Sequence, residues 1–190
     1  MEFPPIDVLP IIDELCSKVP KRARALIRKD PRKPTTGWTT ALKSVLDEMG
    51  TIRGYRSLYT KRSSSMREFL LDFVWWDDDT GVGILGCESE FGNKRYKAGN
   101  PLLVGEDFDK LLSFKARIKL MVFDSYTGKG KESELRREIL AELDRYISSY
   151  GYHLKGEIYV AIDMSDRPKA WTCLITSEGT DSSLSFQPLE

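Results

Sequence analysis

Three acidic side chains, set in or beside apolar segments, are the residues of this chain best suited to chemistry. In VGILGCESEF (82–91) an apolar run ends on Glu88 and Glu90, which lie two residues apart. A strand alternates its faces with a period of two, so both carboxylates are expected on one face. In REFLLDFVWW (67–76) the same alternation places Asp72 on a face with apolar neighbours: Leu70, Val74 and Trp76. Such acids require a cation or a basic partner, because burying an unpaired charge is costly.

The two acidic segments are joined by DDDTG (77–81), which has the composition of a tight turn. Folding about Asp79 places residue 72 roughly opposite residue 86, with Glu88 one same-face step further on. A hard divalent cation suits several carboxylate oxygens, so we predict that Asp72, Glu88 and Glu90 hold Mg²⁺ or Mn²⁺. We interpret the acids of the turn itself as structural. An ion held in this way can polarise a phosphoryl oxygen and lower the pKa of an attacking water.

The order of predicted elements indicates an α/β protein with a central mixed sheet flanked by helices. Helical periodicity occurs before residue 30, where Pro20 is expected to divide two helices, and over 38–49, 106–116 and 133–150. Strands are expected as a three-stranded meander over 52–60, 67–76 and 82–91, and later over 116–125, 157–163 and 169–176. Residues 92–104 are expected to form an exposed loop, and the C-terminal tail to fray.

This arrangement resembles the core of the PD-(D/E)xK nuclease superfamily, the fold of type II restriction endonucleases. The shared elements are, in chain order, a helix, a second strand with an acid, a third strand that ends in E-x-E, a helix and a further strand. They cover residues 38–125. The resemblance implies a restriction-endonuclease-like core and metal-dependent hydrolysis of phosphodiester bonds in nucleic acid, with DNA expected before RNA. It also implies a homodimer, since two single-strand cuts make a double-strand break.

Glu90 departs from the usual pattern, in which the third residue is a lysine. This variant resembles the restriction enzyme BamHI, where a glutamate stands at that position. A glutamate could act as a general base or as a ligand of a second metal ion. The missing lysine could come from the following helix, where Lys110 is expected nearer the end of the third strand than Lys115. Glu48 could be an additional metal ligand from the preceding helix, although a solvated acid in the last turn is the commoner case.

Positive charge is concentrated in the N-terminal third of a chain whose formal net charge is zero. Residues 1–67 hold 14 Lys and Arg against 7 Asp and Glu, and KVPKRARALIRKDPRK (18–33) holds eight basic residues and one acid. A basic surface beside the predicted acidic site suits a polyanionic ligand, which the basic residues bind and the metal ions then contact. We predict phosphate contacts from the basic residues of this segment: Lys21, Arg22, Arg24, Arg28, Lys29, Arg32 and Lys33. The alternative is a solvated helix surface followed by a loop.

Composition is that of an ordinary globular protein, with 41% hydrophobic and 31% charged residues among 190. We expect one domain: a basic helical part (1–50), the nuclease-like core (51–125) and a C-terminal helix with two strands (126–190). No long apolar span or secretory leader is evident, so no membrane contact and a cytoplasmic location are expected. The three cysteines are expected to be reduced thiols, mostly buried. The single histidine, His153, is expected at a surface or interface.

Three functions compete on these grounds. The first is a metal-dependent nuclease. The second is a non-catalytic nucleic-acid-binding or assembly protein that keeps the nuclease fold, which the absence of the E-x-K lysine favours. The third is a metal-dependent phosphohydrolase acting on nucleotides, which is disfavoured because the chain has no phosphate-cradling GxxxxGK[ST] motif.

Overall fold

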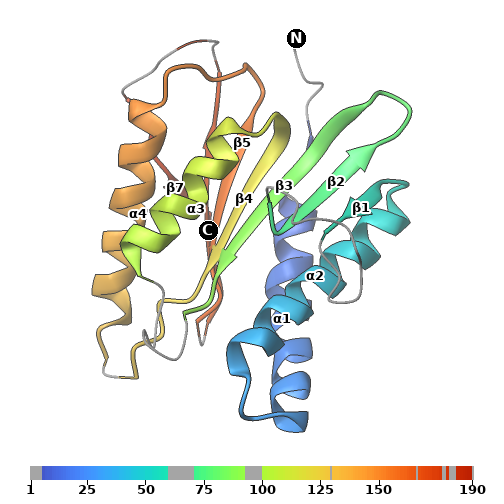
Figure 1. Ribbon diagram of the computed structural model, residues 1–190. Coiled ribbons are helices and arrows are strands. Elements are labelled where there is room, and N and C mark those ends of the chain that lie inside the picture. The colour runs from blue at the N-terminus through green and yellow to red at the C-terminus, as the bar shows by residue number, and fades with distance from the viewer. Residues whose placement is uncertain are drawn as a thin grey trace.

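A computed structural model describes residues 6–59, 71–92, 100–128, 130–165, 167–176, 179 and 183–189. Within these ranges the chain is an α/β protein in which a seven-stranded mixed sheet is flanked by four helices (Figure 1). The predicted class, with a central mixed sheet flanked by helices, is confirmed. No helix in the described part of the chain has a stretch long and apolar enough to cross a membrane.

Local signals explain where the helices begin. α1 (Leu9–Lys29), α2 (Pro34–Ile52) and α3 (Pro101–Ser113) each have a proline in the first turn, where the missing N–H leaves no hydrogen bond unmade. The Asn100 side chain also caps α3 by accepting a hydrogen bond from the Leu102 N–H. α4 (Glu132–Ser149) starts with two acids, which interact favourably with the positive end of the helix dipole.

The first three strands form an antiparallel meander. They are β1 (Arg56–Leu58), β2 (Phe73–Asp77) and β3 (Val82–Glu90). In the turn between β2 and β3 the Asp77 carboxylate accepts hydrogen bonds from the backbone of Asp79 and Thr80. The acids of this turn are therefore structural, as interpreted from the sequence.

The remaining strands extend the sheet on the far side of β3. β4 (Ala116–Phe123) and β5 (Ile158–Asp163) are parallel to β3, because α3 and α4 carry the chain back to the start of the next strand. β6 (Lys169–Leu174) and β7 (Gln187–Pro188) follow in antiparallel pairing. The carboxyl ends of β3, β4 and β5 consequently lie along one edge of the sheet, where α/β proteins commonly bind ligands.

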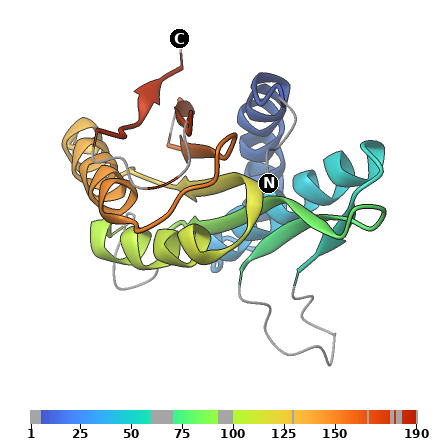
Figure 2. The same cartoon turned by 90° about the horizontal axis from the view of Figure 1, so that it is seen from above.

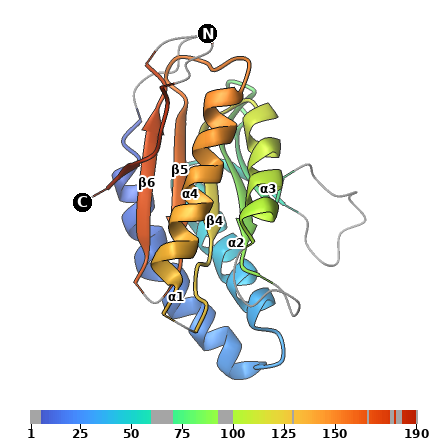
Figure 3. The ribbon, with the colours of Figure 1, turned by 90° about the vertical axis from the view of Figure 1, so that its left-hand side faces the viewer.

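One apolar core lies on each face of the sheet. α1 and α2 cover the face that presents Phe73, Trp75 and Leu85. α3 and α4 cover the other face, which presents Val74 and Tyr159. Figure 3 shows α3 and α4 in front of the sheet and α1 and α2 behind it, and Figure 2 shows the same layers from above. The sheet is thus buried on both sides, and a polar ligand has access only at the strand ends.

The N-terminal helices extend further than predicted. Pro20 does not divide α1, because its buried ring and the packing of Val19 and Ala23 compensate for the lost hydrogen bond. α2 continues through Gly50 to Ile52, so the strand predicted from residue 52 begins at Arg56. Gly50 is helical because Trp75 packs against it: a Cβ there would lie 2.6 Å from the indole nitrogen. Trp75 is a fully buried core residue.

Other differences lie in the second half of the chain. α3 begins at Pro101, within the predicted loop, and β7 forms where the tail was expected to fray. The prediction for His153 was wrong, since it is fully buried, with its ring nitrogens 2.9 Å from the Tyr159 hydroxyl and 3.0 Å from the Ile147 carbonyl oxygen. The connection predicted between the first two strands (61–65) and the central part of the predicted loop (93–99) lie outside the described residues.

Candidate active site

Asp72 lies directly before β2, in a bend, and is not part of the strand. The last ladder pair joins Phe73 to Cys87, so one further step along the register sets Asp72 opposite Glu88. The expected opposition of residues 72 and 86 was wrong by two residues. The turn is centred between Asp79 and Thr80 instead of on Asp79, and a β-bulge lies between Trp75 and Trp76; each shifts the register by one residue. The structure thus brings Asp72 and Glu88 closer in register than the sequence predicted.

The Asp72 carboxylate is held by α2 and by β3. Its Oδ1 accepts a hydrogen bond from Lys43 Nζ at 3.0 Å, and its Oδ2 accepts from the Ser89 N–H at 3.1 Å and from Ser89 Oγ at 2.8 Å. Strand alternation does not determine its direction, because it lies outside the strand. Asp72 therefore sits at the edge of the sheet, with its basic partner on the side of α2.

Glu88 is buried on the side of α3, with only 5% of its surface exposed. It shares a face of β3 with Gly86, where a Cβ would lie close to Leu111 and Phe114. Burial and, after it, the charge of Asp72 raise the pKa of Glu88, and Lys110 partly opposes both, so that the pKa is about 8. A carboxyl in this state gains most from an added cation, because the cation would stabilise the charged form that burial and Asp72 disfavour.

Glu90 ends β3 and borders a polar cleft. Its Oε1 accepts a hydrogen bond from the Gly92 N–H at 2.9 Å, and burial raises the pKa of its carboxyl. The cleft has a volume of about 650 Å³ and lies between α2 and the end of β3. Ser89 and Lys43, both bound to Asp72, also line it. The cleft thus gives solvent and ligands access to Glu90, and to Asp72 only through its partners Lys43 and Ser89.

Lys110 is the lysine of α3 whose charge reaches the acidic residues. It lowers the pKa of Glu88, and its own Nζ lies 2.7 Å from Asp107 Oδ1. The backbone of Lys115 lies instead beside Gly83, at the opposite end of β3. Lys110 lies in the last turn of α3, ahead of Lys115 in the chain, and its charge still reaches Glu88.

The three predicted metal ligands are neighbours, but they do not form a coordination shell as they stand. In the described ranges no group of three Asp, Glu, His or Cys side chains is arranged to hold a metal ion. Carboxylate oxygens are suitable donors for Mg²⁺, and the charge of Asp72 reaches both Glu88 and Glu90. The residues therefore fit a divalent ion by their chemistry, while Lys43 now holds Asp72 Oδ1.

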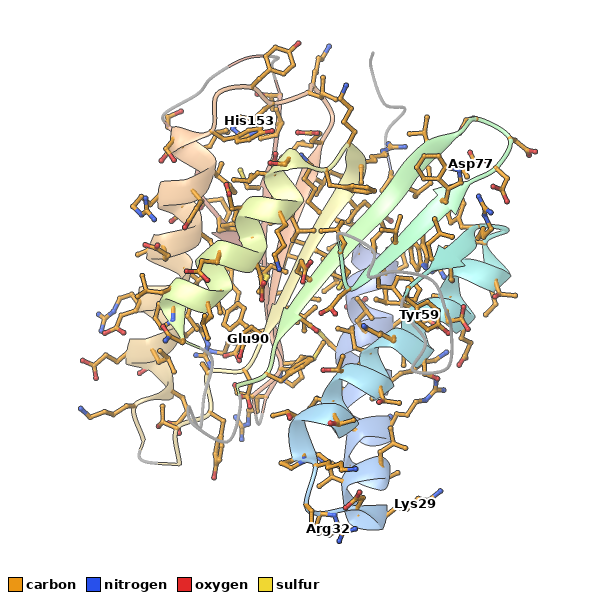
Figure 4. The ribbon with its side chains drawn as sticks, in the orientation of Figure 1. Lys29, Arg32, Tyr59, Asp77, Glu90 and His153 are labelled. Carbon is orange, nitrogen blue, oxygen red and sulfur yellow. The ribbon has the colours of Figure 1, made fainter. Side chains whose placement is uncertain are left out.

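The predicted phosphate-binding residues gather where α1 meets α2. Figure 4 labels Lys29 and Arg32 at the tip of this helical hairpin, which extends beyond the sheet in the direction in which β3 ends. The five exposed basic residues here, named the basic tip, are Arg24, Arg28, Lys29, Arg32 and Lys33. Lys21 is also exposed, whereas Arg22 is engaged with Glu48 and Ser44.

Three polar residues near the site were not found from the sequence: Lys43, Asp47 and Ser89. Glu48, the acid weighed from α2, binds Lys18 and Arg22 of α1 and so joins the two helices. Asp47 instead lines the cleft and accepts a hydrogen bond from the Tyr59 hydroxyl at 3.4 Å. Lys43 and Asp47 are four residues apart and so lie on one helix face, a spacing that could have revealed them.

Known proteins offer no relative from which a role for these residues could be taken. No family model matches the chain, and no curated protein or solved structure matches it either. A functional conclusion therefore depends on the residues of the site and their geometry.

Proposed function

We propose that this chain is a metal-dependent nuclease with a PD-(D/E)xK-like core, acting on phosphodiester bonds, with DNA as the expected substrate and a homodimer as the expected assembly. The observation that carries the proposal is the opposition of Asp72 and Glu88 at the paired ends of β2 and β3. Two carboxyls in this position are mutually repulsive, and a divalent cation relieves that repulsion. Glu90 lies two residues on, at the wall of the cleft.

Each residue of the site has a role in this proposal. Asp72, Glu88 and Glu90 would hold Mg²⁺ or Mn²⁺, which when bound supplies Lewis acidity to the phosphoryl group and to water. Glu90 faces the cleft with a raised pKa, which suits a general base for the attacking water. Lys43 lies between Asp72 and the cleft, where its ammonium group can bind a phosphoryl oxygen. Lys110 balances the charge of Glu88 from the side of α3.

The second candidate function is a non-catalytic nucleic-acid-binding or assembly protein with the same fold. The Lys43–Asp72 ion pair favours it, because the ammonium group at 3.0 Å satisfies Asp72 without a metal ion. In that case Lys43 is a permanent structural partner. The basic tip would still bind phosphates, since such contacts need no catalytic residue.

Cleavage assays with Glu88→Ala separate these functions. A nuclease loses Mg²⁺-dependent cleavage by at least about 100-fold, because an interaction made in the transition state is removed, while nucleic-acid binding persists through the basic tip. Glu48→Ala is the matched control, because Glu48 contacts α1 and lies away from the site, so cleavage should continue. No cleavage by the wild-type protein of duplex or single-stranded DNA or RNA, with Mg²⁺ or Mn²⁺, would leave the binding function.

A further inference from the structure

We infer that the cleft beside Glu90 takes a single strand of nucleic acid, with its phosphates along the hydroxyl groups of α2 and a base stacked on the ring of Tyr59. The inference rests on the proposed function, since it assumes nucleic acid at the acidic residues. It adds that the substrate enters the cleft as a single strand.

The size of the cleft favours one strand over two. Its volume of about 650 Å³ falls within the range of roughly 300–1,000 Å³ of pockets that enclose a small-molecule ligand. Such a space accommodates one or two nucleotides. A double helix could contact only the rim, so the reacting strand has to leave its partner or be unpaired already.

The α2 wall presents neutral hydrogen-bond donors. Thr36 and Thr40 line the cleft, and as residues four apart they lie one above the other on the helix. Neither hydroxyl makes a hydrogen bond to another residue in the described ranges, and Thr40 is exposed. Threonine hydroxyls are common donors to phosphate oxygens and carry no sequence information. This wall therefore suits a sugar-phosphate backbone.

Among the described residues of the cleft, one aromatic ring is accessible to a ligand. Tyr59 and Phe91 both line the cleft, but Phe91 is buried, with 6% of its surface exposed, and is stacked on Trp38 of α2. Tyr59, which follows β1, is half-buried and is stacked on Phe73, with ring centroids 5.0 Å apart. A ring held in this way loses little freedom when a base stacks on it, and base stacking on aromatic rings tolerates any sequence. Hydroxyl groups on α2 and the ring of Tyr59 match the phosphate side and the base side of a single strand.

The charges of the cleft give the binding a dependence on cations. Its charged side chains are Lys43, Asp47 and Glu90, so acids outnumber bases in its lining. The outer end adjoins the basic tip, because Arg32 and Lys33 directly precede α2. A strand would first be attracted by the tip and would enter fully only when a divalent cation offsets the acids.

Binding of a fluorescent oligothymidylate, followed by anisotropy in Ca²⁺, tests the inference. Thr36→Val with Thr40→Val removes two hydroxyls at nearly constant shape, and we expect affinity for the single strand to fall about tenfold. Affinity for a duplex of matching length should not change. Thr51→Val is the control, since Thr51 lies on α2 outside the cleft. Tyr59→Leu should weaken single-strand binding as well, through lost stacking.

Two results would overturn the inference: unchanged single-strand affinity in the folded double variant, or an equal loss for single strand and duplex. Thermal melts establish that the variants are folded. The outcome is separable from the proposed function, because Ca²⁺ supports binding without requiring turnover. If the double variant loses single-strand affinity while the wild-type protein never cleaves with Mg²⁺, the cleft assignment stands and the nuclease proposal fails. If the wild-type protein cleaves and the variant binds unchanged, the nuclease proposal stands and the cleft assignment fails.

Discussion

Two groups of acids stand at the carboxyl ends of parallel strands, and their surroundings differ. Glu90 of β3 and Asp163 of β5 are at the same level of the sheet, since both pair with Phe123 of β4. Asp163 is fully buried and accepts hydrogen bonds from Arg136 Nε at 2.6 Å, from Ser125 Oγ at 2.6 Å and from the Ser125 N–H at 3.0 Å. Near Glu88, by contrast, the charged groups are Asp72, Asp107 and Lys110, of which Lys110 is bound to Asp107.

This contrast separates a structural acid from a candidate catalytic one. A buried carboxylate with a guanidinium and two hydroxyls has its charge and its hydrogen bonds satisfied by the protein. Glu88 is also buried, but a second carboxylate stands opposite, so its charged form is disfavoured. Burial and acidity are common to both places. What distinguishes them is that Arg136 binds Asp163 directly, whereas the lysine that acts on Glu88, Lys110, is bound to Asp107.

Removing the structural acid should have the largest effect on stability. Asp163→Ala leaves Arg136 without its partner in a largely buried position, so we expect the free energy of unfolding to fall by about 3–5 kcal/mol. Urea denaturation at neutral pH measures this. Glu88→Ala in the same assay should cost far less. If the two variants lose equal stability, the distinction between the two acids is wrong.

Glu88→Gln should change how stability depends on pH. The folded-state pKa of Glu88 is about 8, against an ordinary value of 4.5, so the folded protein retains a proton that the unfolded chain releases. Its contribution is therefore fully present below about pH 4.5 and is lost as the pH rises to about 8. At pH 9 the variant should exceed the wild type by about 1–3 kcal/mol, and at pH 4.5 the two should agree. Urea midpoints at both pH values measure the difference. If the stability of the two proteins changes with pH in the same way, the raised pKa assigned to Glu88 is wrong.

Thermal melts in Mn²⁺ test the cation requirement of Glu88 directly. An ion present at about ten times its Kd stabilises a protein by about 1.4 kcal/mol, or roughly 3–5 °C in Tm at this size. We expect this rise in the wild-type protein and none in Glu88→Gln. Glu48→Gln, an acid removed elsewhere, should keep it. An equal rise in all three proteins would place the ion outside the site.

The smallest effect is expected from two lysines, Lys110 in α3 and Lys115 just after it. Lys110 lowers the pKa of Glu88, so Lys110→Met should move that pKa upward, and Lys115→Met should leave it unchanged because Lys115 lies beside the start of β3. An NMR titration of the Glu88 carboxyl distinguishes the two. A larger shift in Lys115→Met would contradict the placement of α3.

The sequence predicts the elements better than the contacts between them. Periodicity depends on neighbouring residues, so the strands, the main helices and the pairing of the Asp72 and Glu88 segments could be derived from it. Neither the exact centre of the turn nor the bulge between Trp75 and Trp76 is marked in the sequence, so the register was wrong by two residues. Lys43 was missed for a related reason, because it reaches Asp72 from a helix that packs on the sheet. The same is true of the partners of Asp163, which come from three separate segments.

The outer strands of the sheet also bear on how two copies could associate. At one side of the described sheet β1 has only three residues, and at the other β7 has only two, one of which is Pro188 and donates no hydrogen bond. Such short edges offer few backbone groups to a neighbouring chain, and edge protection of this kind also opposes aggregation. A continuous sheet running through both copies would therefore gain little, and a homodimer would have to be built from helix or loop surfaces.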